Sequence, residues 1–435
     1  MNAVRSTAEP YWDLVEQSLE EAAFLWKRWE ADLGSLTRNL DEVWTWTEER
    51  LHGALDGVRV AGERVLEVTE AALHGKDMAA RCAAAQVLAA GTPERARGAL
   101  AAAVREAHGA PLQALARGIE TAALDGTFAP VTAALAAAGP EHAAALCRIK
   151  AFRRVAPGRE ATGALEANDP RAQAEVLRSL AYAADDSIAA PSVSWGLSSA
   201  DPEIRRAAIG TGIRRAHAPA WHAAVELLRQ RHPDCAPFLS CVAALGSPEE
   251  RELVIAVLRE PALREPGLFA LAYVGTPQAV EIVLSGMRDE TLARAAGEAY
   301  CAITGAELAR DRLAAAHPPD GPSPPPLEAD DLDASPVPSA HELWPVPDRA
   351  AVERHWQGLK RQFAAGVRYW RGRPLDLQTL IGAVETGPML RRDDLALELA
   401  VRTGGKYDVE PRAFAQTQRI MMRAARARLT AAAAR

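Results

Sequence analysis

The side chains best suited to bind a metal ion lie in one short stretch of the sequence. His217, His222, His232 and Cys235 follow one another there, and imidazole nitrogens and thiolate sulfurs are ligands that zinc prefers. Their spacing does not favour a site. His217 and His222 are five residues apart rather than four, so a helix does not align them, and Pro219 lies between them. We therefore interpret these residues as parts of turns between helices, and we predict no metal and no cofactor.

Sequence motifs for nucleotide binding and nucleophilic catalysis are incomplete. Gly404-Gly405-Lys406 lacks the earlier Gly and the following Ser or Thr of a phosphate-binding loop. Gly210-Thr211-Gly212 lacks the third Gly of a dinucleotide fingerprint, and the G-x-S-x-G motif of serine hydrolases does not occur. Some helical-repeat enzymes hold iron with repeated His-Glu pairs, but this sequence has one His-Glu dipeptide, His341-Glu342. We predict that the chain is not an enzyme.

The elements that would position any site are predicted to be helices. Apolar residues make up 49% of the chain but aromatic residues only 5%, and Ala dominates the apolar set. Ala has the highest helix propensity, whereas strands prefer β-branched and aromatic residues. The formal net charge is −7, which gives no sign of the basic face that nucleic-acid binders usually carry. We expect an all-α protein, and nucleic acid is a disfavoured partner.

The cysteines and the N-terminus indicate where the protein resides. The cysteines are odd in number, scattered, and set mostly among small apolar residues, which is typical of reduced, buried thiols in a cytosolic protein: Cys82, Cys147, Cys235, Cys241 and Cys301. The first residues carry charge and lack the apolar core of a signal peptide. The stretches without charge are too short to cross a bilayer. We expect a cytoplasmic protein that does not enter a membrane.

Residues 1–74 are predicted to form an amphipathic helical cap. Apolar residues recur there at steps of three and four, which places them on one stripe of a helix: Trp12, Val15, Leu19, Ala22, Trp26, Trp29 and Leu33. Gly34-Ser35 ends this helix, and a second one begins near Leu40. The stripe seals the end of a stack of repeats in one interpretation. In the other, Trp26 and Trp29 contact a partner.

Residues 75–316 are predicted to form HEAT-like helical repeats. A Gly followed by Ser or Thr and then Pro recurs, because Gly suits the left-handed end of a helix, the hydroxyl caps the next helix and Pro fits its first turn. An Asp that caps the other helix of each pair also recurs. The positions are Gly91, Gly246 and Gly275 for the first pattern and Asp77, Asp169, Asp201 and Asp289 for the second. Spacings of 29 and 32 residues indicate helix–turn–helix units stacked into a solenoid.

Residues 317–347 are predicted to be a linker, because they contain ten prolines and several acidic residues and cannot bury enough apolar surface to fold alone. Residues 348–435 are predicted to be a C-terminal helical segment, with helices at 377–385 and 391–403. Its final helix is rich in Arg, which we interpret as a solvated helix end with favourable dipole placement. Contact with an acidic partner or nucleic acid is the alternative for that helix.

Three aromatic residues of the C-terminal segment are candidate partner contacts. Trp356, Tyr369 and Trp370 lie in its least repetitive part, beside Arg residues, and aromatic residues and Arg are enriched at interfaces. The alternative is that they pack the C-terminal helices against the repeats.

Several short motifs resemble an uncharacterised bacterial HEAT-like repeat family whose members tend to be encoded beside type VI secretion genes. In chain order these motifs are Glu20–Trp26, Leu55–Gly62, Ala295–Tyr300, Ile303–Gly305, Leu343–Asp348, Arg368–Gly372 and Leu395–Ala400. The resemblance implies an accessory or effector-handling role and brings no catalytic residues with it. The chain departs from the family pattern at Ser18, where a His is common, and at Trp370, where an aliphatic residue is common.

The leading prediction is a non-catalytic scaffold or adaptor that binds another protein, an effector or component of a type VI secretion system. Solenoids suit this role because the stacked units create an extended concave face. The alternative is a helical-repeat enzyme related to bilin lyases or carrying a toxin domain. A nucleic-acid binder ranks third.

Overall fold

The computed structural model describes the chain apart from residues 1–10, 91–93, 123–128, 185, 317–343 and 434–435. The fold is all-α, as the composition predicts. In the described ranges the strands are limited to a short antiparallel hairpin of β1 (Tyr369–Trp370) and β2 (Arg373–Pro374). No described helix is both long enough and apolar enough to cross a membrane.

The contacts between residues divide the chain into two compact units. Unit 1 comprises residues 1–30, 41–220 and 412–419, and unit 2 comprises residues 31–40, 221–411 and 420–435. The boundary at residue 220 falls inside the predicted repeat segment 75–316, and the predicted C-terminal segment contributes to both units. Most of the predicted linker, residues 317–343, lies outside the described residues.

Unit 1 consists of short helices joined by tight turns. It contains all or most of α1 (Trp12–Leu33), α2 (Leu40–Val43), a π-helical turn (Trp44–Glu48), α3 (Glu49–Arg59), a 3₁₀ turn (Gly62–Arg64), α4 (Val65–His74), α5 (Met78–Ala89), α6 (Glu94–Glu106), α7 (Ala110–Thr121), α8 (Ala129–Ala137), α9 (Pro140–Phe152), α10 (Glu160–Glu166), α11 (Pro170–Ser179), a 3₁₀ turn (Leu180–Tyr182), α12 (Asp186–Leu197) and α13 (Pro202–Arg214).

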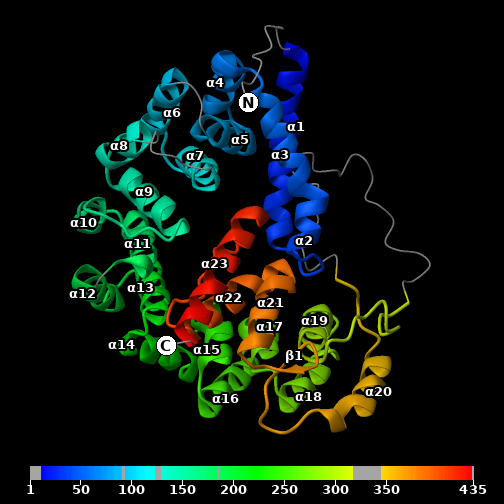
Figure 1. Cartoon of the computed structure of the whole chain (residues 1–435). Coiled ribbons are helices and arrows are strands. Elements are labelled where there is room, and N and C mark those ends of the chain that lie inside the picture. Colours follow the sequence, from blue (N-terminus) through cyan, green and yellow to red (C-terminus); the bar gives the residue numbers. More distant parts are fainter. Residues whose placement is uncertain (1–10, 91–93, 123–128, 185, 317–343, 434–435) are drawn as a thin grey trace, which may run out of the picture. The chain divides into compact units, whose positions relative to one another are not determined.

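Helical pairs stack in chain order within unit 1. Every second helix from α5 to α13 packs on the next, so that α7 lies between α5 and α9, and α11 lies between α9 and α13 (Figure 1). Small residues allow this close packing. A Cβ atom added at Gly118 of α7 would lie 2.2 Å from the carbonyl oxygen of Cys82 in α5. Gly118 is therefore required where these two helices touch.

The predicted Asp caps of unit 1 are confirmed. Asp77, Asp169 and Asp201 each accept hydrogen bonds from two backbone N–H groups in the first turn of α5, α11 and α13, which satisfies donors that the helix itself leaves unpaired. In two of these helices an Arg four residues after the capping Asp also bonds to the preceding turn. Arg81 donates to the Gly75 carbonyl at 2.7 Å and Arg205 to the Ser199 carbonyl at 2.9 Å, so the turn before each of these helices is tied to the helix.

Unit 2 continues with helical pairs and adds the C-terminal segment. It contains all or most of α14 (Ala218–Arg229), α15 (Leu239–Leu245), α16 (Pro248–Ala256), α17 (Arg264–Val274), α18 (Pro277–Gly286), α19 (Ala293–Thr304), α20 (Arg349–Leu359), α21 (Leu377–Thr386), α22 (Arg392–Arg402) and α23 (Ala415–Ala433), with 3₁₀ turns at Pro233–Phe238, Val257–Arg259, Pro261–Leu263, Lys360–Gln362 and Met389–Arg391. Here α15, α17 and α19 pack in succession, and α22 packs on α15.

The turns of unit 2 confirm some of the Gly, Ser/Thr and Asp positions predicted at helix ends and contradict others. Ser247 and Thr276 cap α16 and α18, and Gly275 adopts the left-handed conformation with φ of 64°. The prediction was wrong for Gly246, which is extended with φ of −68° and ψ of 162°. It was also wrong for Asp289, which caps a turn through the backbone and hydroxyl of Thr291 at 3.0 and 2.6 Å, because α19 begins later, at Ala293.

The β1–β2 hairpin docks the C-terminal segment onto the ends of the unit 2 helices. The Tyr369 N–H donates to the Gly275 carbonyl at 2.8 Å, and the Arg371 N–H donates to the Ala302 carbonyl at 2.7 Å. The Arg368 guanidinium donates to the carbonyls of Tyr273 and Ala244 at 2.7 and 2.8 Å. These carbonyls end α17, α15 and α19 and lack partners inside their own helices. The hairpin therefore caps three helices at once.

Candidate functional site

The two tryptophans proposed as contacts in the N-terminal segment lie inside unit 1. Trp26 and Trp29 are 2% and 0% exposed, and their rings meet edge to face at 5.5 Å. The Trp29 indole N–H donates to Glu48 Oε1 at 2.7 Å, and the other oxygen of Glu48 accepts from the backbone N–H of Ala415. The predicted stripe thus belongs to the interior, and it joins α1 to the turn at Trp44–Glu48 and to the start of α23.

The three aromatic candidates of the C-terminal segment are also interior residues. Trp356, Tyr369 and Trp370 are 0%, 5% and 4% exposed. Trp356 donates its indole N–H to Glu281 at 2.8 Å, and Trp370 stacks on Tyr273 with centroids 6.1 Å apart. A partner cannot reach side chains this deeply covered. We therefore correct the assignment of all five aromatic residues from partner contacts to core packing.

The His and Cys residues singled out from the sequence do not assemble into a ligand group. Cys235 is fully buried, and burial raises the pKa of its thiol to about 11. Within the described ranges, a group with metal-ligand spacing forms elsewhere, at His108, Glu141 and His142 in unit 1. The sequence signal for it is a Glu-His pair at the start of one helix and a His just before another.

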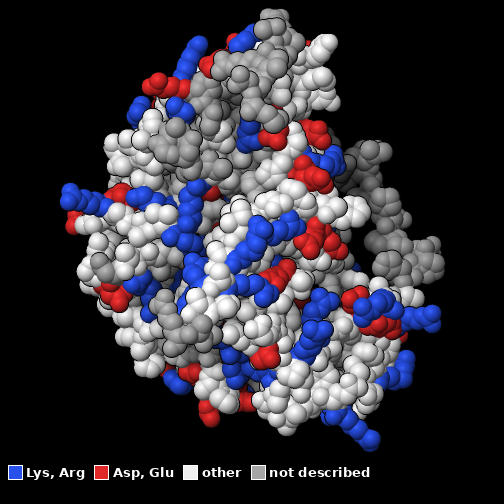
Figure 2. Space-filling view, in the orientation of Figure 1, with Lys and Arg blue, Asp and Glu red and all other residues white. Residues whose placement is uncertain are grey.

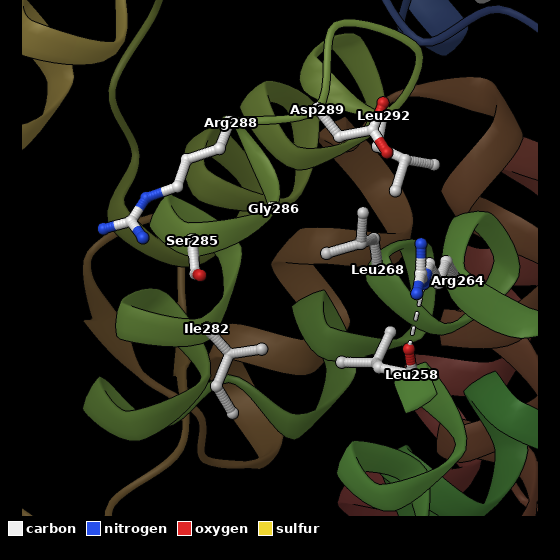
Figure 3. Close-up of a pocket in the computed structure, with 9 residues that line it drawn as sticks. All are labelled: Leu258, Arg264, Leu268, Ile282, Ser285, Gly286, Arg288, Asp289 and Leu292. Atoms are coloured by element: carbon white, nitrogen blue, oxygen red, sulfur yellow. Dashed lines mark hydrogen bonds between the residues drawn. The ribbon is translucent and has the colours of Figure 1, made fainter. Parts of the chain in front are cut away.

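A pocket of unit 2 combines an apolar floor with an ionic rim. We call it the anchor pocket. It has a volume of about 300 Å³ and is lined by Leu258, Arg264, Leu268, Ile282, Ser285, Gly286, Arg288, Asp289 and Leu292. Its walls come from the 3₁₀ turn at Val257–Arg259, from α17 and α18, and from the turn that leads into α19 (Figure 3).

Two glycines shape the floor of the anchor pocket. Leu268 is buried, whereas Leu258, Ile282 and Leu292 are half-buried and form the apolar sides. A Cβ atom at Gly267 would lie 2.6 Å from Leu258 Cδ2, and one at Gly286 would lie 3.0 Å from Leu268 Cδ2. The missing side chains let these leucines settle against the helix backbones and leave the space open.

The rim of the anchor pocket carries two guanidinium groups and one carboxylate. The Arg264 Nε atom donates to the Leu258 carbonyl at 3.4 Å (Figure 3). The guanidinium of Arg288 forms no hydrogen bond or ion pair with any residue that the structure describes. Hydrogen bonds from Thr291, helped by the charge of Arg264, hold the pKa of Asp289 below its ordinary value, so this carboxylate is ionised at neutral pH. The rim is therefore net positive.

The anchor pocket can bind an apolar group but is poorly equipped to transform one. Its one hydroxyl, on Ser285, hydrogen-bonds to no histidine or carboxylate in the described part of the chain, whereas a serine nucleophile needs an adjacent base. Apolar walls with a few polar groups at the rim are typical of recognition sites. The arrangement fits an aliphatic side chain with a negative charge nearby.

A second pocket of unit 2, the Phe269 pocket, has a volume of about 310 Å³ and is lined by Leu36, Glu265, Pro266, Phe269, Ala295, Glu298 and Leu390. The buried Glu298 carboxylate in its lining is already paired. The Arg391 guanidinium donates to both oxygens of Glu298 and to the Phe269 carbonyl, and it stacks 3.5 Å from the centre of the Phe269 ring. The pair belongs to the core, which makes the anchor pocket the better candidate.

Two arginines of α23, and one just before it, form ion pairs within the chain. Figure 2 shows Lys and Arg side chains gathered over α23 with acidic side chains among them. In unit 1 Arg412 pairs with Glu30 at 2.8 Å and Arg419 with Asp41 at 2.6 Å. In unit 2 Arg426 pairs with Glu385 at 2.6 Å. These pairs reduce the positive charge that the helix offers to a polyanion.

Comparison with known proteins does not assign a family. No family model matches the chain, and no curated protein matches it. The resemblance of the short motifs to a HEAT-like family of secretion loci therefore stays a hypothesis.

Proposed function

We propose that the chain is a non-catalytic, HEAT-like helical scaffold that binds a protein partner, an effector or component of a type VI secretion system. The anchor pocket is the observation that carries the binding role. The link to secretion rests on the motif resemblance alone. Stacked helical pairs in unit 1 and unit 2 support the scaffold architecture, because such stacks bury their apolar faces against neighbours and leave long surfaces for partners.

The chemistry of the pocket defines the partner segment. Its apolar floor and sides, which include Leu268 and Ile282, select an aliphatic side chain. The uncommitted guanidinium of Arg288 and the neighbouring Arg264 select an acidic residue close to it, because opposite charges at a rim steer and orient a partner. The occupant is therefore a segment of another protein with an aliphatic anchor flanked by Asp or Glu.

Affinity purification with paired variants tests this function. The tagged chain is expressed in a bacterial strain with an active type VI secretion locus and recovered together with its bound proteins. Arg288→Glu reverses the charge of an exposed rim residue. The matched control is Arg361→Glu, which makes the same change at another exposed Arg of unit 2. Neither substitution touches the core, so both variants are expected to fold.

The proposal predicts a secretion protein in near-stoichiometric yield with the wild type and the control. Its yield falls at least about tenfold with Arg288→Glu, since a lost charge contact at a binding rim costs on the order of 1–2 kcal/mol and the new like charge adds repulsion. Recovery of only ribosomal proteins and chaperones contradicts the secretion role. Equal recovery with both variants contradicts the assignment of the pocket.

A further inference from the structure

Three side chains of the types that bind metals meet where successive helical pairs of unit 1 adjoin. His108 lies just before α7, and Glu141 and His142 lie in the first turn of α9, which packs beside α7 (Figure 1). One ligand atom from each of the three residues lies within 4.8 Å of the other two. Ligand atoms around a tetrahedral zinc ion are about 3.4 Å apart, from metal–ligand distances of about 2.1 Å. The cluster is therefore close to the spacing that a metal requires.

His108 can move to bring the three ligand atoms closer to the spacing around a metal ion. The His108 side chain is 69% exposed, so rotation of its ring costs little packing, and its Nδ1 atom already lies 3.1 Å from Glu141 Oε2. The His142 ring stands edge to face with it, at a centroid distance of 5.0 Å. His142 is 1% exposed and supplies the fixed side of the cluster.

Backbone partners orient the two less mobile ligands. His142 Nε2 lies 3.1 Å from the Val104 carbonyl oxygen. A carbonyl only accepts, so Nε2 carries the proton, and in the neutral ring Nδ1 keeps the lone pair that a metal needs. Glu141 Oε1 accepts from the Gly109 N–H at 2.7 Å, which leaves Oε2 toward His108. Metal-binding histidines commonly donate their second N–H to a carbonyl in this way.

We propose that His108, Glu141 and His142 form a binding site for one divalent transition-metal ion of the Zn²⁺ class. Two imidazole nitrogens and one carboxylate oxygen provide three ligands, and water completes the coordination. The ion connects the turn before α7 with the first turn of α9 and thus fastens two successive helical pairs. This site is independent of the anchor pocket, so failure of either proposal leaves the other standing.

Calorimetric titration of the full, metal-free chain with Zn²⁺ tests the site. The variants are His108→Ala, which removes an exposed ligand, and Glu141→Gln, which keeps an oxygen acceptor for the Gly109 N–H. His74→Ala is the matched control, since His74 is another exposed His of unit 1. Far-UV circular dichroism of the metal-free proteins verifies that each variant is folded before titration.

We expect one Zn²⁺ per chain for the wild type and for His74→Ala, with a rise in the temperature of thermal unfolding because the ion binds the folded state. Binding by His108→Ala and Glu141→Gln should weaken by more than the roughly 10- to 100-fold that loss of an outer-shell partner causes. Absence of Zn²⁺ binding by the wild type overturns the proposal. Equal affinity of His108→Ala and wild type also overturns it, because the ion would then bind elsewhere.

Discussion

Replacing Arg391 with Met should weaken unit 2 by more than any surface substitution. The Arg391 side chain is fully buried, and its partner Glu298 is 4% exposed. Burial by itself would lower the pKa of Arg391, but the charge of Glu298 outweighs it and keeps the guanidinium protonated. The substitution leaves the Glu298 carboxylate in the core without a cation. Breaking a buried pair in this way costs about 3–5 kcal/mol.

A double substitution separates the free-energy cost of leaving one buried charge unpaired from the stabilisation that the Arg391–Glu298 pair itself contributes. In Arg391→Met/Glu298→Leu both charges are replaced by apolar groups of similar size, and such replacements are often neutral or stabilising. We therefore expect the double variant to be more stable than either single variant. Arg288→Met, at an exposed arginine of the same unit, should change stability by less than about 0.5 kcal/mol.

Native-state hydrogen exchange read by mass spectrometry measures these differences locally, on peptides from α19 and α22. A local readout is required because a chain with two units need not unfold in one step. A loss below about 1 kcal/mol in Arg391→Met would refute the reasoning, since the cost of an uncompensated buried charge is larger than that. Additive effects of the two substitutions would refute it as well.

Four further predictions concern packing and titration. Arg368→Ala should cost about 2–3 kcal/mol of local stability in the hairpin, because it removes charge-assisted bonds to Glu398 and to two helix ends; hydrogen exchange of residues 364–376 reports the loss. Gly118→Ala should lower the thermal unfolding temperature, because its Cβ would meet a backbone oxygen at 2.2 Å, whereas the control Gly98→Ala, with open space around its Cβ, should raise it slightly. Thiol reagents should label the folded chain very slowly at pH 8, since all five cysteines are buried and burial raises the pKa of Cys82 to about 12. Because the Cys82 thiol holds its proton more tightly in the folded state than in the unfolded state, the free energy of unfolding should fall as the pH rises above the ordinary thiol pKa of 9.0. Measuring the free energy of unfolding at pH 8 and at pH 10 tests this.

Local features of the fold could be predicted because they depend on neighbours in the sequence. Asp77 and Asp201 mark helix starts since a cap bonds to N–H groups two and three residues on. The stripe through Trp26 and Trp29 follows from helical periodicity. Gly246 was misread because a Gly before Ser-Pro suits either an extended or a left-handed turn, and only the path of the chain decides between them.

The sites could not be predicted because they depend on distant contacts. Aromatic residues beside Arg, as at Trp370, occur both at interfaces and in cores, and only burial separates the two. His108 and Glu141 are 33 residues apart, and their meeting depends on how α7 and α9 stack. The anchor pocket depends on the space that Gly286 leaves beside Leu268. No sequence motif indicates that space.

Panning of a random-peptide display library on the purified chain tests the recognition claim most directly, because the peptides sample many sequences and the natural partner need not be identified first. The anchor pocket predicts enriched peptides with an aliphatic residue flanked by Asp or Glu. It also predicts that synthetic versions bind the wild type and Arg361→Glu alike but bind Arg288→Glu at least about tenfold more weakly. Enrichment of basic peptides, or peptides whose affinity is the same for Arg288→Glu and wild type, would contradict the pocket as the site of binding.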